Sequence, residues 1–387
     1  MDFSLSEEER GLQSAMRDLA RSVFAPRAAE IDRTGAFPWD NVRTLAEAGY
    51  LGMTLPPRYG GAGASFVSFI LCLEEIARAC AVTAVIFEVH NSLHTEPIFR
   101  FGSEAQRERF LPPLAKGEVL GAYCLTEPSS GSDAAAMQSV ATPVDGGYRL
   151  RGQKAFITNG GVADRYVVFA RTSADADRRA ISAFVVDKDS PGLSFGAPER
   201  KMGLHASQTT QVFFDDVFVE EDRLIGERDH GMRIALSTLD YGRVGIAAQA
   251  IGIAQAALDT AANYALERYQ FGRPIAEHQG VQWILAEMAT DLEAARWMCY
   301  RVAWMVDQGR RATTEIAQAK LFASTMANVH IPRALRVLGG YGYLQDHPIE
   351  RNLRDAKVTE IYEGTSEVMK MLVARGVIEA ARNGRTS

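Results

Sequence analysis

The chain has 387 residues, of which 47% are hydrophobic and 23% charged, and its formal net charge at pH 7 is -6. A single hydrophobic core stops growing at roughly 250–300 residues, so we expect two or three domains. The mildly acidic surface, without a concentrated run of Lys and Arg, argues against nucleic acid as the main partner.

The first third of the chain has helical patterns. Ser6 with Glu9 and Ser103 with Gln106 have the spacing of capping boxes, which start helices. Apolar residues repeat at helical spacing over residues 69–79. We therefore expect an all-α domain over residues 1–120.

The pattern changes to short β-rich runs near Gly121. Examples are residues 166–169, 181–186 and 212–214, which are separated by turn residues. These runs predict a small β domain over residues 121–230.

Helical spacing returns after Gly231. Ala-rich stretches cover residues 234–269, 280–308 and 313–338, and we expect Pro332 to interrupt the last of them. Small side chains let helices approach closely, so residues 231–387 are expected to form a helical bundle that also makes subunit contacts.

The chain carries no sign of a zinc site, a disulfide framework or a membrane span. Its four cysteines are widely spaced, and no stretch approaches about 20 uninterrupted apolar residues. The acidic, polar N-terminus does not look like a targeting leader. We expect a cytoplasmic protein, or a mitochondrial matrix protein if a leader has been removed.

Four segments contain polar or glycine residues that a cofactor could contact: CLTEPSSGSD at 124–133, FITNGG at 156–161, ERYQFGR at 267–273 and LGGYGY at 338–343. Taken alone, each is more typical of a turn, a hairpin tip or a helix C-cap. The G-x-G-x-x-G order after a strand is absent, so a dinucleotide would be bound without a Rossmann fold.

Glu363 and two histidines are the remaining candidates. Glu363 lies in a polar turn, where a lone Glu is usually solvated, but a closed apolar pocket would raise its pKa and make it a base. His90 and His94 are four residues apart, yet no third ligand or supporting shell accompanies them, so we expect no metal site.

The order of the motifs is more specific than any one of them. CLTEPSSGSD, KAFITNGG, KMGLHASQT, LDYGRVGIAAQAIGIAQ, ERYQFGRPIAEHQ, LGGYGYLQ and RDAKVTEIYEGTSE follow one another as in the acyl-CoA dehydrogenase family, which the chain resembles over nearly its whole length. The short-chain and branched-short-chain members are the most similar. The resemblance implies an α+β fold with an N-terminal α-helical domain, a middle β-barrel-like domain and a C-terminal four-helix bundle. It also implies a homotetramer that binds FAD.

The resemblance also assigns roles to residues. Glu363 matches the catalytic base, and Gly242 occupies the alternative base position of some members, which leaves Glu363 without a rival. The matching substrate contacts are Ser132, Asp240, Arg243 and Gly364. The matching FAD contacts are Tyr123, Leu125, Thr126, Gly131, Ser132, Phe156, Ile157, Thr158, Arg268, Phe271, Gln279, Arg336, Gly339, Gly340, Thr365 and Glu367.

Some of these matches carry further detail. The resemblance places Thr158 near the flavin N5, and has Arg268, Phe271 and Gln279 reach the FAD of a neighbouring subunit. Two positions depart from the usual pattern. Phe156 stands where many members have Trp, and Arg336 stands where many have Gln.

The implied reaction is α,β-dehydrogenation of a saturated acyl-CoA to a trans-2-enoyl-CoA. Glu363 takes the α-proton, hydride passes to FAD, and electrons go on to an electron-transferring flavoprotein. The implied setting is fatty acid or branched-chain amino acid catabolism, with short or branched-short acyl groups. The alternatives are a flavin monooxygenase or oxidase, a dehydrogenase of carrier-protein-bound acyl groups, and a helical scaffold without flavin.

Overall fold

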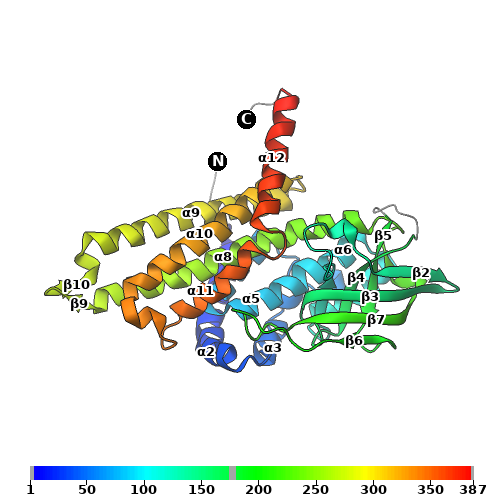
Figure 1. Ribbon diagram of the computed structural model, residues 1–387, viewed down its shortest axis with the longest axis horizontal. Coiled ribbons are helices and arrows are strands. Elements are labelled where there is room, and N and C mark those ends of the chain that lie inside the picture. The colour runs from blue at the N-terminus through cyan, green and yellow to red at the C-terminus, as the bar shows by residue number, and fades with distance from the viewer. Residues whose placement is uncertain (1–3, 174–179, 385–387) are drawn as a thin grey trace.

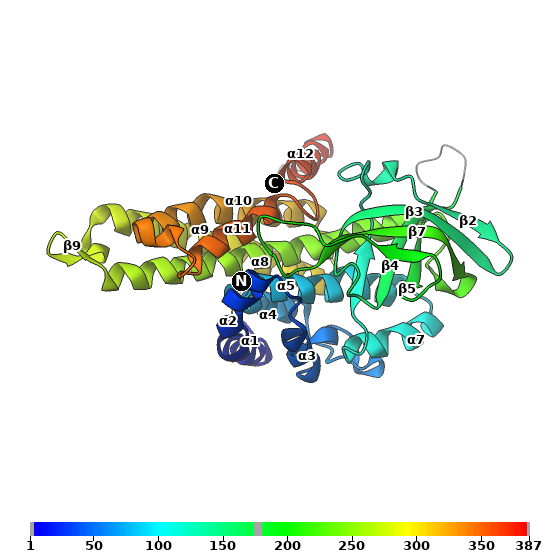
Figure 2. The ribbon, with the colours of Figure 1, turned by 60° about the horizontal axis from the view of Figure 1, so that its bottom comes forward.

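The computed structural model describes residues 4–173 and 180–384. A long helical bundle forms one end of the molecule and a β-sheet the other, while the N-terminal helices pack along both (Figures 1 and 2). The final helix, α12 (Ser366–Arg382), projects away from the body (Figure 1). The expected α+β architecture with helical, β and helical parts is confirmed.

The first part of the chain is helical, and both expected capping boxes are present, at Ser6 with Glu9 and at Ser103 with Gln106. A π-helical segment, Val89–Thr95, joins the fifth helix to the sixth and is buried throughout. The helices are α1 (Glu7–Leu19), α2 (Ala25–Thr34), α3 (Trp39–Glu47), α4 (Phe66–Ala79), α5 (Ala81–Glu88), α6 (Glu96–Phe101) and α7 (Glu104–Ala115).

The middle part is one sheet with strand order β6-β7-β3-β2-β4-β5-β8, to which β1 adds by pairing in parallel with β4. Its own apolar core includes Tyr166, Phe184 and Val212. The strands are β1 (Gly121–Cys124), β2 (Val140–Val144), β3 (Gly147–Thr158), β4 (Arg165–Arg171), β5 (Ile181–Asp187), β6 (Leu193–Phe195), β7 (Thr209–Glu220) and β8 (Leu224–Ile225).

The last part is built on α8 (Gly231–Glu267), which is long and apolar enough to cross a membrane. In this structure, however, 72% of its most apolar window is buried inside the protein, as in a core helix. The other elements are a hairpin of β9 (Tyr269–Gln270) and β10 (Arg273–Pro274), then α9 (Gln279–Asp307), α10 (Thr313–Leu338), α11 (Ile349–Lys357) and α12.

The expected interruption at Pro332 is wrong, because α10 continues through this residue. Proline removes one backbone hydrogen bond and strains a helix interior. Here Ile331 and Ala334, which lie before and after Pro332 in α10, are fully buried. Tertiary packing of this face therefore outweighs the local cost of the proline.

Charged contacts fix the N-terminal helices to the bundle. Asp307, at the end of α9, accepts hydrogen bonds from the backbone N–H groups of Phe66 (2.7 Å) and Val67 (3.0 Å) at the start of α4. A carboxylate is stabilised there by the unsatisfied amides of a helix N-terminus. These contacts hold the start of α4 against the end of α9.

Candidate active site

Glu363 lies in the turn that precedes α12. Its backbone has a positive φ of 54°, and Gly364 follows with a φ of 105°. A bulky residue rarely adopts this conformation unless its surroundings hold it there, and such strain is common at functional sites. Thr365 then caps α12, because its hydroxyl accepts a hydrogen bond from the Val368 N–H at 3.3 Å.

The Glu363 carboxyl group rests against α8 where that helix has no side chain. A Cβ added at Gly242 would lie 2.0 Å from Glu363 Oε2 and 2.8 Å from Leu93 Cδ2. Only glycine leaves room for the carboxyl group at this position. Gly242 therefore serves the placement of Glu363, which agrees with the expectation that it is not itself a base.

Two cationic side chains hold the turn through its carbonyl oxygens. Arg243 Nε donates to the Glu363 carbonyl oxygen at 3.2 Å, and Lys320 Nζ donates to the Gly364 carbonyl oxygen at 2.6 Å. Asp240 fixes Arg243 with an ion pair of 2.7 Å. The structure thus brings Glu363, Gly364, Asp240 and Arg243 together, as expected.

The environment of Glu363 suits a base that works near neutral pH. Burial raises the pKa of Glu363 to about 7, while the adjacent Glu88 side chain, and after it Lys320 and Arg243, act in the opposite direction and favour the carboxylate. Burial also lowers the pKa of Lys320 to about 8. Apart from the neighbouring Glu88 carboxyl group, the buried Oε2 atom of Glu363 has no hydrogen-bond partner among the described residues, so the carboxyl group keeps capacity to accept a proton.

On the sheet side of the site, two of the segments expected to contact the cofactor, residues 124–133 and 156–161, lie next to each other. The Ala155 N–H donates to the Thr126 carbonyl oxygen at 2.9 Å, which joins the loop after β1 to the end of β3. Lys154 strengthens this join, since its buried ammonium donates to Leu125 O (3.0 Å) and Glu127 Oε1 (2.8 Å).

The exposure of the remaining sheet-side residues leaves a surface for a ligand. Tyr123 and Ile157 are buried, Thr126 and Thr158 are half-buried, and Ser132 is exposed. Gly131, next to Ser132, is exposed as well. Hydroxyl groups and backbone at this surface can hydrogen-bond to the polar edge of a flavin.

Two aromatic side chains are exposed on strained backbone. Phe156, near the end of β3, is 66% exposed with a φ of 57°, and Phe271, in the β9–β10 hairpin, is 94% exposed with a φ of 54°. Such rings cost free energy in water and pack well on a planar ligand. Both residues therefore fit the expected flavin and adenine contacts.

The far end of the bundle holds the expected diphosphate residues. Arg268, Gly339 and Gly340 line a cavity of about 470 Å³. Gly339 has a φ of 60°, and a Cβ added at either glycine would meet no atom within 4 Å. A guanidinium beside open backbone suits a phosphate group. Arg336, near the end of α10, and Gln279, the first residue of α9, are exposed as well.

One chain does not bring the two cofactor groups together. The β9–β10 hairpin, which carries Phe271, lies at one end of the molecule and β3 at the other, while the base of α12 lies between them (Figure 1). The hairpin segment that is expected to reach the cofactor of a neighbouring subunit therefore lies apart from β3 of its own chain. Thr365 and Glu367 lie with Glu363 at the start of α12.

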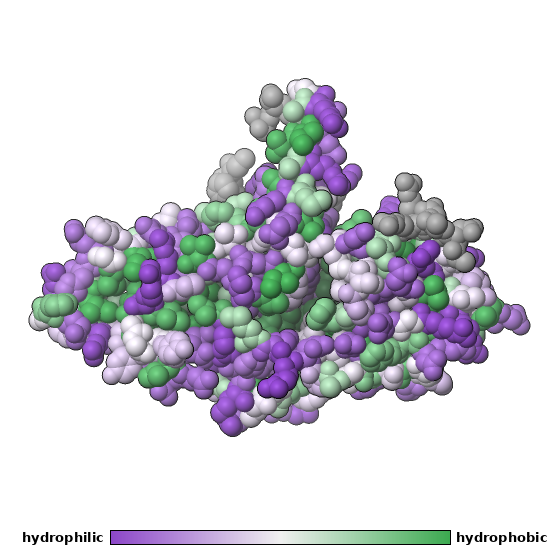
Figure 3. All heavy atoms as spheres, viewed as in Figure 1, coloured by the Kyte–Doolittle hydropathy of each residue, from purple (hydrophilic) through white to green (hydrophobic). Residues whose placement is uncertain are grey.

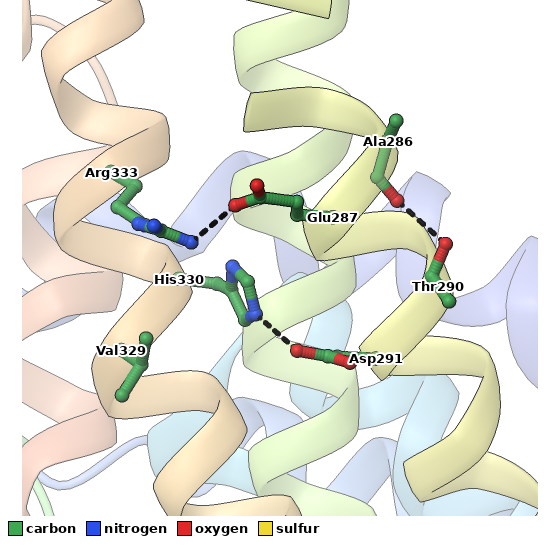
Figure 4. Close-up of a pocket in the computed structure, with 7 residues that line it drawn as sticks. All are labelled: Ala286, Glu287, Thr290, Asp291, Val329, His330 and Arg333. Atoms are coloured by element: carbon green, nitrogen blue, oxygen red, sulfur yellow. Dashed lines mark hydrogen bonds and ion pairs between the residues drawn. The ribbon is translucent and has the colours of Figure 1, made fainter. Parts of the chain in front are cut away.

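A second cavity of about 410 Å³ lies between α9 and α10 (Figure 4). Two contacts span it: His330 Nε2 with Asp291 Oδ2 at 2.7 Å, and Arg333 Nη1 with Glu287 Oε2 at 2.6 Å. None of the expected site residues lines this cavity. These two contacts fasten α9 to α10.

His90 and His94 are structural side chains. Burial lowers the pKa of His90 to about 4 and that of His94 to about 3, so both are neutral. Their ring nitrogens lie 3.1 Å from Leu114 O and 2.9 Å from Ala122 O. They fix β1 and the end of α7 to the π-helical segment.

Sequence patterns missed three residues of this site. Glu88 and Lys320 are fully buried, and Tyr362 donates a short hydrogen bond to Gln249. A charged residue within an apolar helical stretch was the signal available for Glu88 and Lys320, since charged side chains are almost never fully buried unless paired. Nothing in the local pattern indicates that they meet Glu363.

Three sequence-family models match the chain: Acyl-CoA dehydrogenase, N-terminal domain (residues 6–118), middle domain (122–217) and C-terminal domain (229–378). A short-chain specific acyl-CoA dehydrogenase of Clostridium acetobutylicum is 44% identical over 97% of this chain and 99% of its own.

Solved structures match as well. Butyryl-CoA dehydrogenase from Megasphaera elsdenii is 41% identical, with a TM-score of 0.96 over 98% of this chain and 100% of that one. A chain in a structure described as the electron transferring flavoprotein of Acidaminococcus fermentans is 42% identical, with a TM-score of 0.96 over 98% of this chain and 100% of that one.

Proposed function

The chain belongs to the acyl-CoA dehydrogenase family, and we propose that Glu363 is the base that removes the α-proton of its acyl-CoA substrate. Membership makes the protein an oxidoreductase that acts on CH–CH groups. The observation that carries the proposal is the buried Glu363 carboxyl group, which lies against Gly242 of α8 in a turn held by two cations.

The α-proton of a saturated thioester is weakly acidic, so its removal needs a well-placed base and a stabilised enolate oxygen. Glu363 would take this proton as a carboxylate, and its own backbone N–H would donate a hydrogen bond to the thioester oxygen. Arg243 and Lys320 hold the turn through its carbonyl oxygens. They thereby fix the positions of the Glu363 carboxylate and of the Glu363 backbone N–H relative to each other. FAD, when bound, supplies the acceptor for the hydride that leaves the β-carbon.

The residues present fit FAD. We assign its ring to the surface of Thr126, Phe156 and Thr158, and its diphosphate to Arg268 with the open backbone of the Gly339–Gly340 pair. The phenyl ring of Phe156 keeps the flat contact of an indole but has no N–H to donate. At position 336 this chain has a cationic Arg where many family members have a neutral Gln. A cation at this position favours binding of a phosphate group.

Completion of this site requires a second copy of the chain. The two groups of cofactor residues lie at opposite ends of one chain, so a neighbouring copy must bring its hairpin to the sheet (Figure 1). Apolar side chains gather over the bundle and along α12 on the face shown in Figure 3. Trp283, Trp297 and Trp304 are exposed on α9, as are Met371 and Val377 on α12. We assign these faces to contacts within a homotetramer.

The relatives support a proposal for the acyl substrate and for the electron acceptor. Two of the relatives are named for short-chain and butyryl-CoA substrates, which supports a short or branched-short acyl-CoA as the substrate of this protein. We propose an electron-transferring flavoprotein as the electron acceptor, which the flavoprotein structure in the comparison supports. The proposed setting is fatty acid or branched-chain amino acid catabolism in the cytoplasm, or in the mitochondrial matrix if a leader has been removed.

The test is the Glu363→Gln variant, which keeps the size of the side chain but removes the base. We expect retained FAD and a rate of flavin reduction by acyl-CoA that is about 100- to 10,000-fold lower. The matched control is Glu360→Gln, three residues upstream, where the carboxyl group pairs with Lys357 at 2.7 Å. Near-normal reduction of flavin in Glu363→Gln would remove Glu363 from the mechanism, and strong oxygen consumption without acyl-CoA would favour an oxidase or monooxygenase.

A further inference from the structure

A second buried carboxyl group meets Glu363 on the surface of α8. Glu88 is the last residue of α5 and is fully buried. A Cβ added at Gly245 would lie 2.7 Å from Glu88 Cγ and 3.1 Å from Glu88 Oε1. Gly245 is one helical turn after Gly242, whose missing side chain makes room for Glu363. Positions three residues apart on a helix are neighbours, so the two carboxyl groups lie side by side.

Each of these carboxyl groups has an oxygen that lacks a donor. Oε2 of Glu88 and Oε2 of Glu363 are buried and without a hydrogen-bond partner among the described residues. Two ionised carboxylates cannot share a dry site, because each disfavours the charge of the other. A single proton between the two groups removes the repulsion and satisfies both orphan oxygens.

The surroundings decide which group carries that proton. Lys320 of α10 and Arg243 of α8 face Glu363 and favour its carboxylate. Burial and the adjacent Glu363 raise the pKa of Glu88 well above its usual range, and only the Ser92 hydroxyl opposes this shift. Tyr123 of β1 and Tyr362 also face the pair, and burial raises the pKa of each phenol, so both are neutral. Glu88 is therefore the protonated member.

We propose that Glu88 is a positioning residue for the catalytic base, and that its protonated carboxyl group donates a hydrogen bond to the Glu363 carboxylate. This inference rests on the proposed role of Glu363 as the base. The bond orients the carboxylate on the Gly242 surface before substrate binds, and it favours the ionised form that accepts a proton. Glu88 keeps its own proton when Glu363 takes the α-proton, so the proton balance of the reaction is unchanged.

The experiment measures the rate of flavin reduction against pH in holoenzyme variants, with butyryl-CoA as the probe. Glu88→Gln keeps a hydrogen-bond donor and should stay close to the wild-type rate at neutral pH. Glu88→Met removes the donor, so the base ionises only at higher pH. We expect a rate about tenfold lower at pH 7, since a hydrogen bond to an ionised group is lost, with recovery as the pH is raised.

The matched control is Glu96→Gln on α6. Burial raises the pKa of Glu96 to about 7, and its carboxyl group pairs with Arg100 at 3.8 Å. The pH profile of this variant should match that of the wild type. If Glu88→Met does not fold, Gly245→Ala replaces it, because the added methyl group displaces Glu88 and should produce the same alkaline shift.

The outcomes separate the two proposals. Loss of activity in Glu88→Gln as severe as in Glu363→Gln would overturn the positioning role, because a donor alone would not suffice. An unchanged pH profile in Glu88→Met, or a loss that no pH restores, would overturn it as well. If Glu363→Gln itself reduces flavin normally, the proposed function fails instead, whatever Glu88 does.

Discussion

Substitution of Gly242 by Ala tests whether the placement of the Glu363 carboxyl group controls the reaction. The added Cβ would lie 2.0 Å from Glu363 Oε2, 2.8 Å from Leu93 Cδ2 and 3.0 Å from Glu363 Cδ. Carbon and oxygen atoms approach no closer than about 3.3 Å, so the carboxylate must retreat by more than about 1 Å. A displacement of that size costs roughly 100-fold in rate when the reacting atoms must align.

The fold should survive this change. Overpacking of this kind costs about 1–3 kcal/mol, which is a minor part of the roughly 5–15 kcal/mol that stabilises a typical domain. The assay is stopped-flow flavin reduction without oxygen, beside a thermal unfolding curve. The control is Gly11→Ala in the middle of α1, where an added Cβ meets nothing within 4 Å. That variant should gain about 0.5–1 kcal/mol and reduce flavin normally. A wild-type rate in Gly242→Ala would refute the reasoning.

Three further outcomes are expected. The rate of flavin reduction should rise with pH through about 7, because burial raises the pKa of Glu363 to about 7 and the base acts only when ionised; a rate that falls over this range would contradict the assignment. Lys154→Met should destabilise the sheet domain by about 3 kcal/mol in denaturant unfolding, because it leaves the buried Glu127 carboxylate unpaired. Phe271→Ala should weaken FAD retention during gel filtration without changing the melting of the apoprotein, because the ring is 94% exposed in a single chain.

The parts of the fold that follow from local rules could be predicted from the sequence. The capping boxes at Ser6 and Ser103 need only two residues at fixed spacing, and both formed as expected. Pro332 shows where such a rule fails, because the helix around it is stabilised by burial against other elements. Propensity measures the isolated segment, and packing overrides it.

The candidate active site also has features that the sequence indicated and features that it did not. The proposed role of Glu363 came from the order of motifs along the chain. The proximity of Glu363 to Glu88 could not be predicted in this way, because the two residues are far apart in sequence and meet only on the glycine surface of α8. The proposed contribution of a neighbouring copy came from the resemblance to the family and not from local patterns, and the structure adds only that Phe271 and Phe156 are each exposed in one chain.

Anaerobic titration of the purified holoenzyme with acyl-CoAs tests the central claim most directly. The panel runs from isobutyryl-CoA and butyryl-CoA to palmitoyl-CoA, and the bleaching of the flavin absorbance is followed in the wild type and in Glu363→Gln. We expect rapid bleaching of the wild type by a short or branched-short acyl-CoA and almost none in the variant. Absence of bleaching by every acyl-CoA in a wild-type protein that retains FAD would contradict the assigned reaction, and equal bleaching of both proteins would contradict the role of Glu363.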